Sequence, residues 1–181
     1  MWIDTPEHLV LALFVRDATG LRPWTGLDVP PLAPAVAARG RLAPAARSEA
    51  TAQWATWWQR ELARQGRGER GYAMPDAELG DGEELAELFL SHRLEGLDWT
   101  AARKGEDAAA LHRGTEGDLV RAVEAELGRK ARPFLLRVTE LPVAGPFGLR
   151  VSTSHLVVSR TLRDDPAAYE EWLTPVLREL A

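Results

Sequence analysis

The only convincing β-strand pattern in the chain is FLLRVTELPVAGPFGLRVSTSHLVV, residues 134–158, and the expected fold class depends on it. Apolar residues occupy alternate positions from Phe134 to Val138, and after a turn-forming segment at 144–148 the same two-residue period continues through Leu149, Val151, Thr153, His155 and Val157. The pattern predicts an antiparallel hairpin of residues 134–139 and 149–158. Because a lone hairpin is only marginally stable, we expect it to pack on helices, to gain a third strand or to pair across a dimer.

Most of the remaining chain has helical periodicity. Apolar residues recur three and four positions apart in four stretches, at 44–65, 81–96, 115–128 and 165–180. Asp81 begins a capping-box pattern and Gly96 is placed to end that helix, while short helical turns are expected at 98–104 and 106–113. We therefore expect a mainly helical α+β fold, with about five to seven helices and a carboxyl-proximal hairpin.

The apolar run from Leu9 to Val15 leaves no polar face for two helical turns. Thr5 and Pro6 before it and Gly20 after it are start and stop signals, so a helix is favoured over a buried strand. A helix that is apolar all round must be central or covered by another chain. This helix and the hairpin therefore both suggest a homodimer.

The length of 181 residues fits a single globular domain spanning 1–181. Between residues 22 and 44 lie five of the twelve prolines, which predict an extended, ordered strap rather than a PxxP ligand. The sequence RQGRGERG at 64–71 predicts a flexible Gly/Arg connector rather than an RNA-binding tract.

The composition excludes several classes of function. The chain has no cysteine, which rules out disulfides, zinc–thiolate sites and thiolate catalysis. A formal net charge of −5 opposes nucleic-acid binding, and the four histidines are dispersed, so neither a metal nor another cofactor is expected. The longest apolar run is too short to cross a membrane and lacks the basic flank of a signal peptide, so we expect a cytoplasmic protein.

Tryptophan is the conspicuous aromatic residue, with seven in the chain. Three of them share one face of the predicted 44–65 helix, and because other large apolar residues are few we expect these indoles in the core. The alternative is a pocket lined by tryptophans, with a histidine as its polar group. The residues of that candidate site are Trp54, Trp57, Trp58, Trp99, His92 and His155.

A second candidate site is the acidic start of the 81–96 helix, which contains Glu83, Glu84 and Glu87. Glu83 and Glu87 are four residues apart, a like-charge pair that costs a few tenths of a kcal/mol unless a basic partner offsets it. The alternative is a solvated face, since acidic residues are favoured near a helix start.

No catalytic set is recognisable: phosphate loops, dinucleotide fingerprints and nucleophile elbows are absent, and Ser154 and His155 would point to opposite faces of a strand. We therefore expect a non-catalytic interaction or regulatory protein, which acts through contacts with an unknown protein or with a second copy of itself. The alternative is a small-molecule-binding protein or enzyme that uses the tryptophan-lined pocket.

Overall fold

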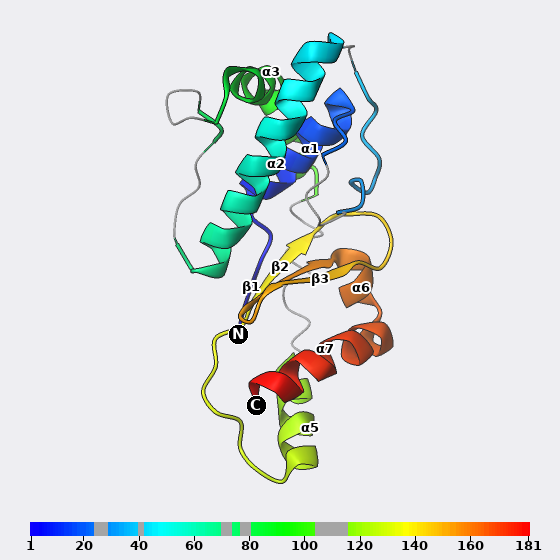
Figure 1. Ribbon diagram of the computed structural model, residues 1–181. Coiled ribbons are helices and arrows are strands. Elements are labelled where there is room, and N and C mark those ends of the chain that lie inside the picture. The colour runs from blue at the N-terminus through cyan, green and yellow to red at the C-terminus, as the bar shows by residue number, and fades with distance from the viewer. Residues whose placement is uncertain (24–28, 40–41, 70–73, 77–80, 104–115) are drawn as a thin grey trace.

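The computed structural model describes residues 1–23, 29–39, 42–69, 74–76, 81–103 and 116–181, and over these ranges it has three layers (Figure 1). The central sheet contains β1 (Trp2–Asp4), β2 (Arg137–Leu141), β3 (Gly148–Ser152) and β4 (His155–Ser159). One face is covered by α1 (Glu7–Thr19), α2 (Pro44–Gly66) and α3 (Glu83–Ala101). On the other side lie α5 (Glu116–Leu127), α6 (Arg160–Asp164) and α7 (Pro166–Leu180). The predicted mainly helical α+β fold is confirmed.

The sheet separates two apolar clusters, because successive side chains along a strand point to opposite faces of the sheet. The strand order is β1-β2-β4-β3, with β1, β2 and β4 parallel and β3 antiparallel to β4. Val157 belongs to the cluster of α1, α2 and α3, whereas Leu156 and Val158 belong to the cluster of α5 and α7. Helices cover both faces, so every residue of β4 is buried.

The hairpin forms within the second of the two predicted strands, because residues 149–158 are not one strand but parts of β3 and β4. It joins β3 to β4 through a turn at Thr153 and Ser154, whereas β2 pairs with β4 in parallel. The alternation runs on through this turn and does not say which strands pair, so the predicted pairing of 134–139 with 149–158 was wrong. The expected extension of the hairpin occurs within the chain, since β2 and β1 continue the sheet.

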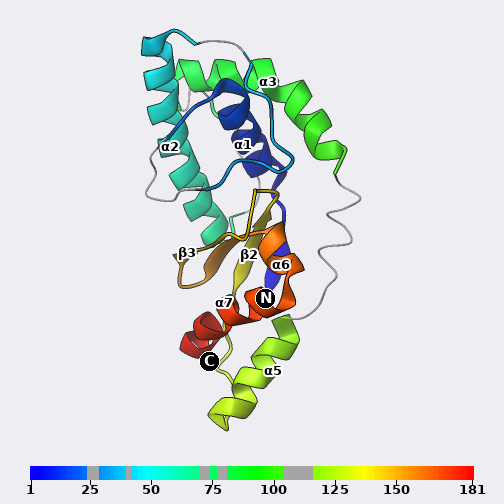
Figure 2. The same ribbon diagram turned by 90° about the vertical axis from the view of Figure 1, so that its right-hand side faces the viewer.

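Helix α1 is central, which explains its lack of a polar face. All residues from His8 to Thr19 are buried, and the helix contacts both α2 and α3 (Figure 2). The predicted helix is thus confirmed, and one chain alone satisfies both features that suggested a homodimer. No helix within the described ranges has the length and apolar character needed to cross a membrane.

The described part of the proline-rich strap is fastened to the end of α1. Arg16 donates from its two Nη atoms to the carbonyl oxygens of Val29 and Pro30, each at 2.8 Å. The backbone nitrogen of Leu32 donates to Asp17 Oδ2 at 2.7 Å, and Leu32 also forms an isolated bridge to the segment after β2. These charge-assisted bonds hold a segment in which proline limits the number of backbone donors.

Helix α3 is longer than predicted. It runs through Gly96, where a Cβ atom would lie 2.3 Å from Leu11 Cδ1, so this glycine permits close approach to α1 and does not end the helix. Asp81 does not cap α3; its carboxylate pairs with Arg60 instead. The turn predicted at 98–104 begins as the last residues of α3, while the turn predicted at 106–113 lies outside the described residues.

Candidate functional site

The three tryptophans of α2 lie in the core. Trp54, Trp57 and Trp58 are each at most 1 % exposed. Trp54 stacks on Trp58 with 4.9 Å between ring centroids, and its Nε1 donates to the carbonyl oxygen of Ala12 at 2.9 Å. Trp57 packs against Phe89 of α3. The indoles therefore fill the space between α1, α2 and α3.

The remaining members of the tryptophan–histidine site lie apart from that cluster or at its margin. Trp99 is half-buried, with the Arg103 guanidinium carbon 3.7 Å from its ring centroid. His92 is half-buried on α3, where its Nδ1 lies 2.9 Å from the carbonyl oxygen of Leu88. Hollows in the surface at the start of α2 and the end of α5 are lined by none of the six residues. The structure therefore does not bring the six together.

His155 is a buried residue of the sheet. It is 0 % exposed, its Nε2 lies 2.9 Å from Thr139 Oγ1, and its ring faces Gly66 at the end of α2. Burial and the nearby charge of Arg137 lower the pKa of His155 to about 4. The imidazole is therefore neutral at pH 7.

We expect His155 to make folding sensitive to mild acid. Between its ordinary pKa of 6.5 and its native pKa of about 4, the unfolded chain takes up a proton that the native chain excludes. Stability is therefore full above pH 6.5 and falls as the pH drops to 4, by on the order of 3 kcal/mol at 1.36 kcal/mol per pKa unit. Urea unfolding across this range should show the slope in the native sequence and a flatter profile in His155→Gln; equal slopes would contradict the assignment.

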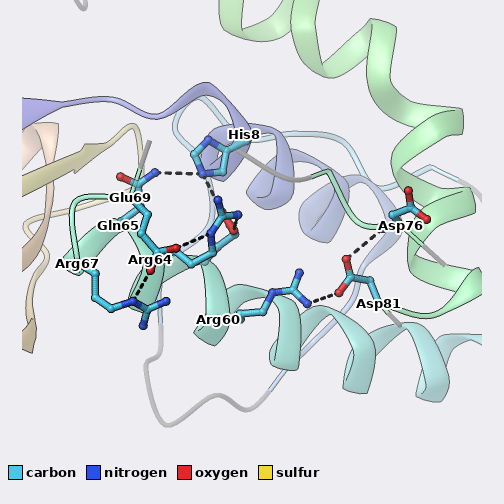
Figure 3. Close-up of polar contacts among 9 residues, drawn as sticks. His8, Arg60, Arg64, Gln65, Arg67, Glu69, Asp76 and Asp81 are labelled. Carbon is cyan, nitrogen blue, oxygen red and sulfur yellow. Dashed lines mark hydrogen bonds and ion pairs between the residues drawn. The ribbon is translucent and has the colours of Figure 1, made fainter. Parts of the chain in front are cut away.

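A polar network surrounds the C-terminal half of α2 (Figure 3). Glu61 is 1 % exposed; its Oε2 lies 3.4 Å from His8 Nε2, and its Oε1 accepts from Arg64 at 2.7 Å. Gln65 Nε2 lies 3.3 Å from the same His8 nitrogen. Burial acts to raise the pKa of Glu61, but the hydrogen bond from His8 and the charge of Arg64 outweigh it, so the pKa is lowered. The ionised carboxylate holds α1 to α2.

This network has the imidazole–carboxylate pairing of a general base but not its accessibility. His8 and Glu61 are only 6 % and 1 % exposed, so a substrate could not reach either side chain without local opening. Arg64 and Arg67 also bind Glu69, within the predicted connector, whose last residues, 70–71, lie outside the described ranges. Among the described residues no group of three or more acidic or histidine side chains could hold a metal. The network is therefore best explained as structural.

The outer surface of α3 differs from these buried groups. Glu83 and Glu87 are exposed, whereas Glu84 is half-buried and accepts a 2.7 Å hydrogen bond from Gln53. Leu90 and Leu94 are 71 % and 78 % exposed. The positions 83, 87, 90 and 94 are spaced so that these side chains form one stripe along the helix.

We call this stripe, together with the exposed Asp98 that continues it, the α3 outer face: Glu83, Glu87, Leu90, Leu94 and Asp98. None of its three carboxylates forms an ion pair with any residue that the structure describes. Figure 2 shows α3 at the periphery of the helical layer. The glutamates were predicted from sequence but the leucines were not, although Leu90 and Leu94 lie off the buried stripe of Leu85, Leu88 and Phe89.

Comparisons with known proteins supply no functional assignment for this chain. No protein-family model, curated protein or solved structure matches it.

Proposed function

We propose that this protein is a non-catalytic interaction protein that binds a partner protein through the α3 outer face. The observation that carries the proposal is the exposure of Leu90 and Leu94, at 71 % and 78 %, one helical turn apart. Single exposed leucines are common, but adjacent ones bordered by charged residues are typical of protein interaction sites. The cytoplasmic location expected from the sequence remains part of this proposal.

The other candidate groups support structure rather than chemistry. Trp54, Trp57 and Trp58 fill the core, which leaves the small-molecule alternative without a supporting observation. His155 and the His8–Glu61 pair are buried within the fold. The α3 outer face is the candidate whose side chains are already accessible to another molecule.

A protein other than a second copy is the better partner for this surface. The apolar helix α1 and the hairpin, which suggested self-association, are both covered or extended within one chain. The α3 outer face carries three carboxylates and no lysine or arginine, so pairing it with its own copy would bring six carboxylates together, with Arg93 of each copy as the one basic residue of α3 beside them. Like charges brought together at an interface disfavour association.

We expect binding to depend on the leucine pair. A displayed library of random 18-residue peptides would be selected against the full chain and against Leu90→Ser/Leu94→Ser. Loss of one buried leucine side chain weakens binding by about tenfold or more, so peptides enriched on the native chain should bind the double variant at least ~100-fold more weakly.

The matched control is Leu135→Ser, because Leu135 is 86 % exposed and lies outside α3. This variant should retain the affinity of the native chain for every selected peptide. Circular dichroism would show that all three proteins are folded. Selected peptides that bind the Leu90→Ser/Leu94→Ser variant as tightly as the native chain would refute the proposed function.

A further inference from the structure

We infer that the segment recognised by the α3 outer face is a basic amphipathic helix, an inference that rests on the proposed function. The two leucines supply an apolar contact, and carboxylates lie beyond both ends of it. Glu83 and Glu87 precede Leu90, and Asp98 follows Leu94 by one helical turn. A complementary partner therefore needs apolar residues at its centre and lysine or arginine on both sides.

The charges on α3 are arranged asymmetrically about the leucines. Glu87 and Asp98 lie on one side of the stripe, whereas the exposed Arg93 lies on the other. A basic partner approaching along that side therefore meets Glu87 and Asp98, and Glu83 in line with the leucines, and none of the three forms an ion pair with described residues. Positive charge on the partner would accelerate encounter and make binding sensitive to salt.

The backbone of α3 favours a helix over a strand as the partner. Strand addition needs a free sheet edge, and the backbone groups along the middle of a helix are already bonded to one another. Leu90 and Leu94 form an i,i+4 ridge, which packs into the groove between side-chain rows of a second helix. Side chains at i, i+3, i+4 and i+7 of the partner would contact this ridge.

The sequences selected from the peptide library test this inference separately from the proposed function. We expect the enriched peptides to carry an excess of lysine and arginine beside apolar residues at three- and four-residue spacing. Their circular dichroism should become helical on binding to the full chain. Their affinity should fall as salt is raised from 50 mM to 500 mM, because salt shortens the range over which exposed charges interact.

A charge-neutral variant provides the matched control. Glu83→Gln/Glu87→Gln/Asp98→Asn keeps both leucines and nearly the same shape, and each lost exposed ion pair should weaken binding by about two- to fivefold. The triple variant should therefore bind the enriched peptides roughly tenfold or more weakly, and with little salt dependence.

Three other results would overturn the inference. Enriched peptides that need Leu90 and Leu94 but are neutral or acidic would leave the proposed function standing and refute a basic partner. If no peptide is enriched in a way that depends on the leucines, both the proposed function and this inference are refuted. A native dimer in sedimentation that Leu90→Ser/Leu94→Ser converts to monomer would identify a second copy as the occupant.

Discussion

Replacing Arg163 by methionine should lower the free energy of unfolding by about 3–5 kcal/mol, because it breaks a buried ion-pair network. Arg163 donates to Glu140 at 2.6 Å and to Glu116 at 2.8 Å, and none of these side chains is more than 4 % exposed. In Arg163→Met, Glu140 keeps its ion pair with Arg160, whereas Glu116 loses the ion pair that it forms with Arg163. The network joins β2, α5 and α6, and urea unfolding followed by circular dichroism would measure its loss.

Two further variants separate this effect from a general cost of losing arginine. Arg178 pairs with Glu126 at the surface, where the side chains are 47 % and 52 % exposed, so Arg178→Met should cost less than about 1 kcal/mol. Glu116→Leu/Arg163→Met should recover much of the lost stability, since it removes the carboxylate that Arg163→Met leaves unpaired, while Glu140 keeps its ion pair with Arg160. If Arg163→Met costs no more than Arg178→Met, the network is not a source of stability.

The sequence predicted the helices well because their periodicity is local. The helices at 44–65, 115–128 and 165–180 match α2, α5 and α7 closely. Strand pairing is not local, because the alternation in β2 is the same whether β2 pairs with β3 or with β4. The strand β1 is too short to show a period at all. Gly96 shows the same limit, since a glycine that ends a helix and one that permits helix contact look alike in sequence.

The candidate site was only half predictable for a similar reason. Charge patterning indicated Glu83 and Glu87, because like charges four residues apart are visible in sequence. The exposure of Leu90 and Leu94 depends on which side of α3 faces α1, and that is set by the packing of Gly96 on Leu11. A leucine-rich helix of this kind has more apolar positions than its inner face can cover, and sequence alone does not say which remain outside.

Replacing Trp54 by alanine should cost about 3–5 kcal/mol, because it removes the ring that stacks on Trp58 and leaves a cavity in the core. The substitution also removes the donor to the Ala12 carbonyl oxygen. The matched control is Trp2→Ala: Trp2 is 64 % exposed on β1, so the same chemical change should alter stability by only about 0.5 kcal/mol. Urea unfolding of both variants would make the comparison.

Added indole distinguishes a filled core from a natural binding pocket. If Trp54 fills the core, Trp54→Ala contains an apolar cavity that free indole can enter, and its stability should rise with indole concentration. The native chain should show no such rise, because its own indole already occupies the space. Stabilisation of the native chain by indole, or a cost of Trp54→Ala no larger than that of Trp2→Ala, would mean that the tryptophans leave room for a ligand after all.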